Sequence, residues 1–351
     1  MEVAAPTGNA PQLLMGWTHT AFPMGDTSCV GEARRFAAHA SAEMDWSDTD
    51  TGRLSIVVTE LATNLHLHAR NGRLLVAAVP ALGLVELIAI DHGPGIEDLP
   101  RSMRDGYSTG GTQGTGLGAV RRLADDFDIH SSVPQGTVCV ARVRRHREPG
   151  DAPAAPPQRL RVGAIRLPLA GENVCGDAWA AALDGARAAL FVGDGLGHGS
   201  EAAKASGAAA ALFLQAPFAD LREQIEDMHA ELQSTRGAAV CSLRLDAEAA
   251  TVRSTGVGNV VARVVSGLSD RSIVTQHGTV GMAMRRPQET TTALPPYALL
   301  VVHSDGIETR WHSDSIQRLL GSDPTLVAAV LMRDHHRSRD DATVVVVQCT
   351  E

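Results

Sequence analysis

The sequence predicts an α/β (α+β) protein built from two domains, and three observations lead to this. A chain of 351 residues is longer than one hydrophobic core usually serves. Residues 148–158 contain four prolines among small residues, so they can form neither a helix nor a central strand and indicate a linker. On both sides of this linker, segments with the helical spacing of apolar residues alternate with β-like runs. We therefore place one domain at 1–147 and the other at 159–351.

The composition excludes several classes of protein. With 44% hydrophobic and 20% charged residues, the chain is globular and not disordered. The net charge of -9 and the scattered arginines argue against a nucleic-acid surface. The five cysteines lack any CxxC pairing, which fits reduced thiols better than a disulfide framework or a zinc site. No apolar run approaches the roughly 18 residues of a membrane helix, so we expect a soluble cytoplasmic protein with neither nucleic acid nor membrane as a partner.

In the first domain, the helices and strands follow from the spacing of apolar residues. Leu54, Val57, Leu61 and Leu65 recur at the spacing of an amphipathic helix. Short uninterrupted apolar runs predict buried strands. The expected order is a strand at 17–20, helices at 28–44 and 51–68, strands at 73–79 and 84–90, a loop at 91–116, a helix that reaches Phe127, and strands near Ile129 and at 138–143.

The second domain is dominated by β-like segments. Strands are expected at 161–167, 179–183, 188–192, 239–245, 251–257, 298–303 and 343–348. Helices are expected at 200–214 and 221–233, and around Ile316 and Leu326. The alanine-rich stretch 202–211 belongs to the first of these helices, because alanine is the best helix former.

Three segments of the first domain carry residues suited to a phosphate ligand. Glu60 and Asn64 stand one turn apart on a flank of the 51–68 helix. Asp91 ends a strand and precedes a glycine turn, which lets a ligand approach the backbone closely. Further glycines open a helix, whose free N–H groups can bind an anion. Each segment alone has an ordinary structural explanation, but the three in this order predict a nucleotide site. The glycines concerned are Gly93, Gly95, Gly114, Gly116 and Gly118.

Residues 26–143 resemble the Bergerat-fold (GHKL) ATPases, and among them the small serine kinases of bacterial partner-switching systems. The segment Thr59–Asn64 matches the N box of this family, Asp91–Gly95 its first glycine box and Gly114–Gly118 its second. The stretch Asp105–Gly110 is more similar to the RsbT switch kinases than to the RsbW anti-sigma kinases. The resemblance implies an α/β sandwich in which a few helices cover a mixed sheet.

The same resemblance implies a role for each residue. Glu60 would polarise the attacking hydroxyl of a protein substrate, and Asn64 would bind the Mg²⁺ that bridges the phosphates of ATP. Asp91 would accept a hydrogen bond from the adenine amino group. Gly93 and Gly95 would shape the base pocket, and Gly114, Gly116 and Gly118 would hold the phosphates. Leu67 stands where many relatives carry a lysine or an arginine. His66 and His68 point to different sides of the helix, so we expect structural roles for them.

Four acidic sites in the second domain share one pattern, an apolar β-like run beside an aspartate. Aspartates at strand ends converge across a sheet and form an oxygen-rich pocket suited to Mg²⁺ or Mn²⁺. Asp-Gly pairs also mark hairpin turns, which is the interpretation we prefer for Asp184-Gly185. Phosphate-monoester hydrolysis needs accelerations up to about 10²¹, and one general acid or base supplies only about 10² to 10⁴, which favours metals. The four sites are Cys175–Asp177, Val192–Gly199, His303–Gly306 and Arg339–Thr343.

Residues 160–348 resemble the PPM-type metal-dependent protein phosphatases, specifically the SpoIIE-like branch that includes RsbX. The segment Val192–Gly199 is a highly specific match. The resemblance implies an α/β/β/α sandwich in which the catalytic Asp194 bridges two Mn²⁺ or Mg²⁺ ions, while bound hydroxide attacks phosphoserine or phosphothreonine. Asp341 stands where the wider family often has asparagine and is left out of the ligand set, and His198 is either a general acid or structural. The further ligands would be Asp177 and the Gly195 carbonyl at one ion, and Asp305 and Asp340 at the other.

These features predict a cytoplasmic bifunctional regulator of bacterial stress or sigma-factor signalling. With Mg-ATP, the first domain would phosphorylate Ser or Thr of a STAS-domain partner, an anti-anti-sigma or stressosome-like protein. The second domain would dephosphorylate such a partner, and a sigma-factor regulator is a further candidate partner. Two alternatives remain open. The first domain either binds ATP and a partner, as an anti-sigma-like or switch module with little kinase activity, or it senses ATP for the phosphatase. Leu67 keeps the first of these alternatives open.

Overall fold

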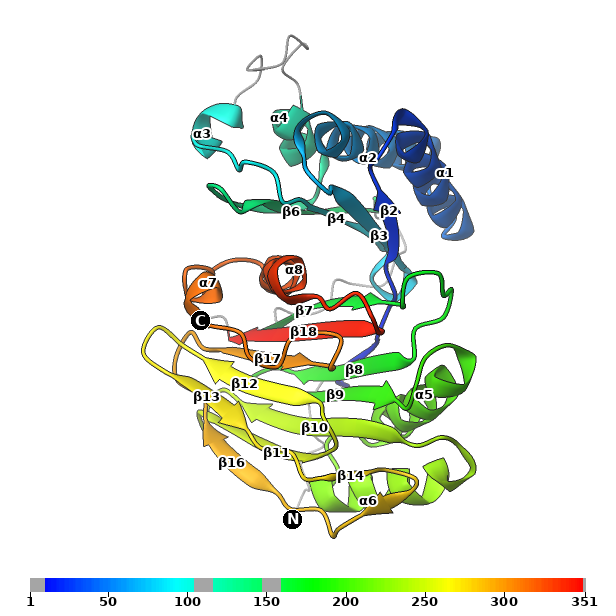
Figure 1. Cartoon of the computed structure of the whole chain (residues 1–351), viewed down its shortest axis with the longest axis vertical. Helices are drawn as coiled ribbons and strands as arrows, with labels where there is room; N and C mark the ends of the chain where they lie inside the picture. Colours follow the sequence, from blue (N-terminus) through cyan, green and yellow to red (C-terminus); the bar gives the residue numbers. More distant parts are fainter. Residues whose placement is uncertain (1–9, 104–115, 147–158, 350–351) are drawn as a thin grey trace, which may run out of the picture. The chain divides into compact units, whose positions relative to one another are not determined.

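The structure is a computed structural model of the chain that describes residues 10–103, 116–146 and 159–349 (Figure 1). It divides into two compact units, each assembled from separate stretches of the sequence. The smaller unit consists of residues 17–152 and 322–336. The larger unit consists of residues 1–16, 153–321 and 337–351.

The smaller unit contains a five-stranded sheet in the order β2-β3-β4-β6-β5. Every described strand pair in it is antiparallel, so the expectation of a mixed sheet was wrong. In the register of β4 and β6, Glu86 lies opposite Arg142. The strands are β2 (Thr20–Pro23), β3 (Arg73–Val79), β4 (Leu84–Ile90), β5 (Asp126–Ser132) and β6 (Gly136–Arg144).

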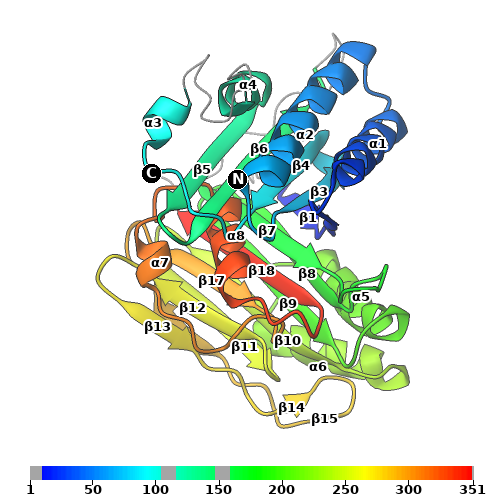
Figure 2. The same cartoon turned by 45° about the horizontal axis from the view of Figure 1, so that its top comes forward.

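Three helices cover one face of this sheet, as Figure 2 shows. They are α1 (Thr27–Glu43), α2 (Asp48–His68) and α4 (Gly116–Leu123). Asp26 and Ser47 cap α1 and α2, because their side chains accept hydrogen bonds from main-chain N–H groups of the first turn. The helices bury one stripe of apolar side chains against the sheet. From the sheet this core takes Phe22, Leu74, Val76, Val85, Leu87, Ala89, Cys139, Ala141 and Val143.

The opposite face of the same sheet is covered by α8 (Pro324–His335), which comes from near the end of the chain. Side chains alternate between the two faces of a strand. Because Val85 and Leu87 face the core under α1 and α2, Glu86 faces the other way, where its carboxylate meets Thr325 of α8. All seven residues of β4 are buried, as expected for a strand that is covered on both faces.

The larger unit contains two main sheets (Figure 1). One has six strands in the order β1-β8-β9-β10-β11-β16, and the other has five in the order β13-β12-β17-β18-β7. The six strands are β1 (Gln12–Met15), β8 (Asp177–Asp184), β9 (Arg187–Gly195), β10 (Ala238–Asp246), β11 (Thr251–Val257) and β16 (Thr290–Ala293). The five are β7 (Leu160–Leu167), β12 (Val261–Val265), β13 (Asp270–Ile273), β17 (Leu299–His303) and β18 (Ala342–Cys349). A small ribbon pairs β14 (Gly278–Thr279) with β15 (Ala283–Met284).

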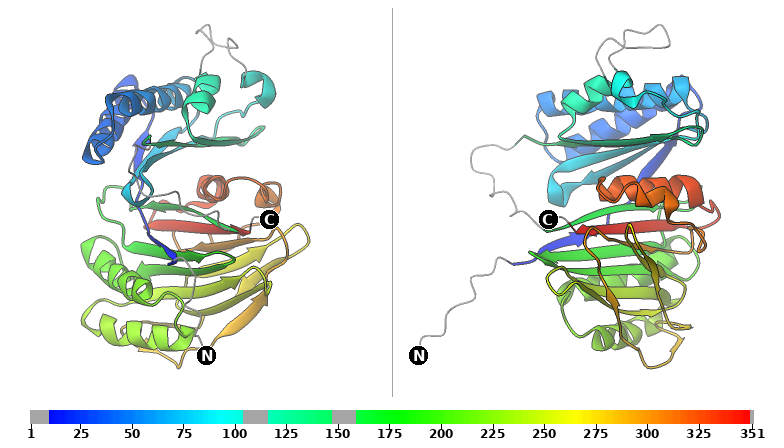
Figure 3. Two further views of the ribbon diagram at one scale, coloured as in Figure 1. Left: turned by 180° about the vertical axis from the view of Figure 1, so that it is seen from behind. Right: turned by 90° about the vertical axis from the view of Figure 1, so that its left-hand side faces the viewer.

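Two helices, α5 (Ser200–Gln215) and α6 (Leu221–Glu231), pack on the same side of the six-stranded sheet (Figure 3). Alanines dominate the face of α5 that meets the sheet, and their small side chains let the helix approach closely. The rings of Phe191 and Phe213 pack against each other with centroids 5.8 Å apart. Short helices complete the described chain: α3 (Leu99–Ser102), α7 (Asp314–Gln317), η1 (Pro80–Leu82) and η2 (Leu232–Ser234).

The structure confirms most expected elements and corrects several. The strand expected at 17–20 is displaced, because β1 ends at Met15 and β2 begins only at Thr20. The helix expected to reach Phe127 ends at Leu123, and Phe127 instead lies in β5, paired with Ala141. The apolar side chain of Phe127 fits both the spacing of apolar residues in a helix and the alternation of a strand that also contains Ile129. Asp194 lies within β9 and not after it. The strands β12, β13 and β16 were not expected.

The two units do not follow the expected domain boundaries throughout. Residues 1–16 belong to the larger unit, where β1 pairs with β8, and residues 322–336 belong to the smaller one. The expected linker, 148–158, lies outside the described residues, so that boundary stays a prediction. Among the described helices, none is long and apolar enough to cross a membrane. None of the five cysteines, all of which lie in the described part of the chain, forms a disulfide.

Candidate nucleotide and metal sites

Helix α2 and the start of α4 bring the first group of expected site residues together. Glu60 and Asn64 are both partly buried on a flank of α2. Gly116, the first residue of α4, lies beside Asn64: a Cβ atom at Gly116 would be 3.2 Å from the Asn64 amide nitrogen. Gly118 is buried in the first turn of α4. Gly114 and the stretch 105–110 lie outside the described residues.

Asp91 stands at the end of β4, in a loop that is held on both sides. Its main-chain N–H donates to the Thr137 carbonyl at 3.0 Å, and its Oδ1 accepts from the Gly93 N–H at 2.6 Å. Burial raises the pKa of the Asp91 carboxyl, although the Gly93 hydrogen bond acts in the opposite direction. Gly95 has φ +78°, where a glycine is favoured. The loop thus presents a partly buried acceptor beside exposed backbone, which suits a planar base with an amino group.

Leu67, the departure from the family pattern, lies on the solvent side of α2. Its side chain is 52% exposed, and it follows Asn64 by three residues on the same helix. It adds no positive charge where a phosphate would lie. His66 is partly buried and His68 is exposed, and since they are two residues apart they point to different sides of α2.

The second group of expected residues gathers at the ends of β8, β9, β17 and β18. Asp177 lies directly opposite Asp194 in the β8–β9 register. Asp305 follows β17, and Asp340 precedes the neighbouring strand β18. Burial raises the pKa of Asp177 to about 7. Burial, together with the charges of Asp177, Asp305, Asp340 and Asp341, raises the pKa of Asp194 to about 9. The structure therefore brings the expected ligands into one electrostatic cluster.

Asp341 differs from the other aspartates of this cluster, because both of its oxygens are already occupied. They accept hydrogen bonds from the main-chain N–H groups of Leu169 and Gly176, each at 2.8 Å. Asp341 therefore ties the loops before β8 to the start of β18. A close approach also explains Gly306, since a Cβ atom there would lie 2.0 Å from the Asp341 carbonyl oxygen.

The donor set fits two hard divalent cations. It consists of carboxylates and one main-chain carbonyl, the oxygen ligands that Mg²⁺ and Mn²⁺ prefer. Buried like charges of this kind need a compensating positive charge. Among the described residues, however, no three acidic, histidine or cysteine side chains form a group that could hold a metal ion. Asp177 accepts from the Ser304 hydroxyl at 2.7 Å, and Asp305 from the Asn259 amide at 2.7 Å.

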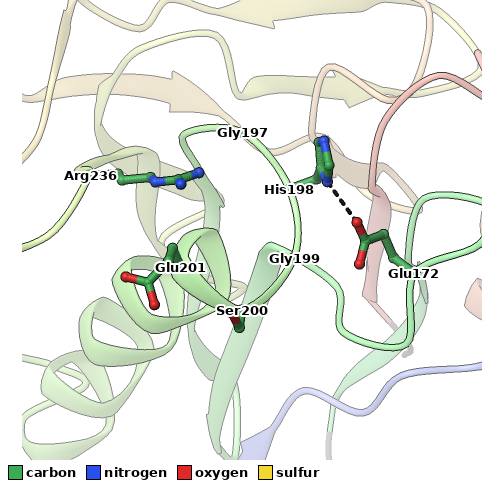
Figure 4. Close-up of a pocket in the computed structure, with 7 residues that line it drawn as sticks. All are labelled: Glu172, Gly197, His198, Gly199, Ser200, Glu201 and Arg236. Atoms are coloured by element: carbon green, nitrogen blue, oxygen red, sulfur yellow. Dashed lines mark hydrogen bonds and ion pairs between the residues drawn. The ribbon is translucent and has the colours of Figure 1, made fainter.

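A pocket of about 460 Å³ opens beside the loop that follows Asp194 (Figure 4). In it, His198 Nδ1 and a Glu172 carboxylate oxygen are 2.9 Å apart. His198 is exposed, and its partner Glu172 comes from the loop before β8. Arg236 reaches the same pocket from the start of β10. Glu172 and Arg236 were not predicted from the sequence, because nothing in their local sequence marks them as neighbours of this loop. The pocket is lined by Glu172, Gly197, His198, Gly199, Ser200, Glu201 and Arg236.

Comparisons with known proteins match the two parts of the chain separately. Residues 25–143 match the family described as the histidine kinase-like ATPase domain, and residues 184–350 match the family of stage II sporulation protein E (SpoIIE). The serine/threonine-protein kinase RsbT of Bacillus subtilis (strain 168) is 36% identical over 124 residues, which are 32% of this chain and 93% of RsbT. The anti-sigma F factor of Caldanaerobacter subterraneus subsp. tengcongensis is 25% identical over 112 residues, 30% of this chain and 78% of that protein.

Solved structures are similar as well. A chain from a study described as "The bacterial stressosome: a modular system that has been adapted to control secondary messenger signaling" superposes with a TM-score of 0.51 at 26% identity, over 54% of this chain and 98% of that one. A structure of RsbX in complex with magnesium has a TM-score of 0.49 at 22% identity, over 54% of this chain and 96% of that one.

Fold and sites thus define a protein in which a GHKL-type nucleotide-binding domain is fused to a PPM-type phosphatase domain. Through its N-terminal part, which spans nearly the whole of RsbT, the chain belongs to the RsbT family of partner-switching proteins. Its C-terminal part is a SpoIIE-type phosphatase domain. The fold class and the fusion expected from the sequence are confirmed.

Proposed function

We propose that this protein adds and removes phosphoryl groups on a STAS-domain partner in the cytoplasm, and so acts as a bifunctional partner-switching regulator. The observation that carries the hydrolytic half is the cluster of Asp177, Asp194, Asp305 and Asp340, in which burial and mutual repulsion raise the pKa values of the first two. The observation that supports the kinase half is the approach of Asn64 to the start of α4, with Glu60 one turn away.

In the nucleotide-binding domain, each residue would hold one part of Mg-ATP. Asp91 would accept from the base amino group, the N–H groups of Gly116 and Gly118 would bind phosphate at the start of α4, and Asn64 would bind Mg²⁺. Glu60 would hold the serine or threonine hydroxyl of the partner and take its proton. When bound, Mg²⁺ neutralises charge on the transferring phosphoryl group.

In the phosphatase domain, Asp194 would bridge two cations. Asp177 and the Gly195 carbonyl would complete one site, and Asp305 and Asp340 the other. When bound, such ions would lower the pKa of a water molecule and neutralise the phosphoryl oxygens. The protein's own contribution is to hold these carboxylates close together, which β8, β9, β17 and β18 do through their register.

The phosphatase half is tested with an aryl phosphate and Mn²⁺. We expect phosphate release by the full chain and loss of at least about 10³-fold in Asp194→Ala, because the metal pair supplies most of the acceleration. Asp184→Ala is the matched control, since Asp184 lies in the β8–β9 hairpin turn opposite Arg187 and should not affect the rate. Full activity in Asp194→Ala would contradict the two-metal assignment.

The kinase half is tested with labelled ATP, Mg²⁺ and a purified STAS-domain protein. Label should appear on the partner with the full chain. Glu60→Ala should abolish transfer and leave nucleotide binding intact, while Glu32→Ala on the exposed side of α1 should change neither. Transfer that is unchanged in Glu60→Ala would remove Glu60 from its proposed role.

A second candidate function is favoured by the exposed Leu67. In this alternative the first domain binds ATP and a STAS-type or sigma-factor partner, with little phosphotransfer. Nucleotide binding without any label on the partner would support it. Leu67→Lys is the sharper experiment, because a cation three residues after Asn64 adds a charge at the phosphate end of the site. A gain in labelling would show that Leu67 restrains the kinase.

A further inference from the structure

Helix α8 is anchored to the sheet of the smaller unit at its N-terminal end. Asp323 caps the helix by accepting from the Thr325 N–H at 2.9 Å. The same carboxylate accepts from both terminal nitrogens of Arg142, at 2.7 and 3.0 Å. The main-chain N–H of Asp323 donates to Asp128 at 2.7 Å. Arg142 also donates to the fully buried Glu86 at 2.7 Å. These contacts fix where α8 begins relative to β4, β5 and β6.

The C-terminal end of α8 contacts the loop that carries Asp91. His92 Nε2 donates to the main-chain carbonyl of Arg333 at 3.0 Å. The Arg333 guanidinium is buried, pairs with Asp334 at 2.7 Å and donates to the Gly136 carbonyl at 3.4 Å. Gly136 lies against Asp91, since a Cβ atom at Gly136 would be 2.2 Å from the Asp91 carbonyl oxygen. Arg333 therefore contacts two residues next to Asp91: His92, which follows it in the sequence, and Gly136, which packs against it.

The lengths of helix and strand agree with this arrangement. From Asp323 to Arg333 a helix advances about 15 Å, at 1.5 Å per residue. From Glu86 to Asp91 a strand advances about 17 Å, at about 3.4 Å per residue. A helix anchored at Glu86 and Arg142 thus reaches the end of β4 after ten residues. Its contact with the Asp91 loop follows from its length and its anchored start.

We propose that Arg333 is a positioning residue of the nucleotide site, which holds His92 and Gly136 so that Asp91 can read the base. The base pocket would then be completed by a helix that lies, in the sequence, within the SpoIIE-type region. This inference rests on the proposed role of Asp91 in binding adenine.

The chemistry of the two purine bases provides a specific readout. Adenine presents an amino group where guanine presents a carbonyl, so an ionised Asp91 favours adenine and repels guanine. A small displacement of the Asp91 loop weakens the hydrogen bond to the adenine amino group and also relieves the repulsion of the guanine carbonyl. The charge of Arg333 also favours the ionised carboxylate, against the burial that raises the Asp91 pKa. Removing Arg333 should therefore reduce the preference for adenine as well as the affinity. A purely structural residue would change the stability alone.

The experiment measures binding of ADP and of GDP to the full chain by calorimetry with Mg²⁺ present. Arg333→Met keeps an unbranched side chain in the buried site and removes the charge and donors. We expect it to weaken ADP binding about tenfold and to lower the ratio of ADP to GDP affinity. Arg333→Lys should restore part of both, because it returns the charge without the planar group. Arg318→Met, at an exposed arginine after α7, is the control and should change neither value.

Two results would overturn the proposal. One is an unchanged ADP affinity and an unchanged ADP-to-GDP ratio in folded Arg333→Met. If that variant does not fold, His92→Ala serves instead, because His92 is exposed and its ring makes the other contact between the Asp91 loop and Arg333, at the Arg333 main-chain carbonyl. An unchanged ratio there would also overturn it. If the unmodified chain binds no ADP at all, the proposed nucleotide site itself is wrong, and this failure is distinct from a variant without effect.

Discussion

At the scale of single residues, the aspartate cluster must cost stability when no metal is bound. The pKa of Asp194 is raised to about 9 by burial and by its acidic neighbours, so the folded state binds this proton more tightly than the unfolded state does. The resulting cost is absent below the ordinary value of 3.8 and grows as the pH rises towards about 9. At neutral pH the metal-free protein therefore carries an electrostatic strain, which cations bound at the proposed site would relieve.

Asp194→Asn tests this strain separately from catalysis. The amide cannot ionise, so at pH 7 the metal-free variant should melt higher than the unmodified chain, by roughly 2–4 °C for each kcal/mol regained. The increase in melting temperature on adding Mn²⁺ should be smaller than in the unmodified protein. Asp184→Asn in the hairpin turn is the control. A variant that melts lower without metal but keeps the full response to Mn²⁺ would argue against Asp194 as a ligand.

At the scale of elements, the buried ionic network beneath α8 makes one arginine decisive. Arg142 lies between Glu86 and Asp323, and each of these side chains is less than 12% exposed. Arg142→Met should lower the free energy of unfolding by about 3–5 kcal/mol, because it leaves two buried carboxylates without their partner. Arg144→Met, two residues along the same strand, removes a pair with Asp126 in which both side chains are 42% exposed. It should cost about 1 kcal/mol or less.

Urea unfolding of both variants compares the two values directly. Equal losses for Arg142→Met and Arg144→Met would contradict the proposed importance of this network for α8.

The same network predicts the pH range over which the protein loses stability in acid. Burial alone would raise the pKa of Glu86, but the charges of Arg142 and His19 and their hydrogen bonds to the carboxylate lower it to about 2. A depressed folded pKa means that the stabilisation is complete above the ordinary value of 4.5 and is lost as the pH falls towards about 2. In Glu86→Gln, the free energy of unfolding should therefore fall less steeply between these values. A slope identical to that of the unmodified chain would contradict the assignment.

Some elements could be predicted from the sequence and others could not, for a physical reason. The bounds of β3 and β4 were correct, because an uninterrupted apolar run between polar ends has one interpretation. The aspartate cluster was predictable as a set of motifs, since each motif marks a strand end. The position of α8 was not predictable, because its apolar residues are buried on every side and such a pattern does not say which sheet covers them. Glu86 and Arg142 gave no signal either, being a single pair 56 residues apart.

At the scale of the whole molecule, one stretch of chain connects the two proposed ligand sites, because residues 322–336 belong to the smaller unit and the residues that follow them belong to the larger one. The chain leaves the smaller unit after His336 and reaches the proposed ligand Asp340 four residues later. On the way, the Arg337 N–H donates to the Gly306 carbonyl at 2.9 Å, next to Asp305. A nucleotide that stabilised the end of α8 would therefore act on a segment that is continuous in the sequence with the proposed metal site. By linkage, the effect must be equal in both directions.

We expect ADP to change the affinity for Mn²⁺, and Mn²⁺ to change the affinity for ADP, by the same factor of roughly fivefold or more. Free Mn²⁺ is set with a metal buffer, so that its binding to the nucleotide does not enter the comparison. Arg333→Met should bring the factor towards one, because it removes the guanidinium that contacts the Gly136 carbonyl beside Asp91, while Arg318→Met should leave the factor unchanged. If the Mn²⁺ affinity of the unmodified chain is the same with and without saturating ADP, the two sites work independently and α8 serves the nucleotide site alone.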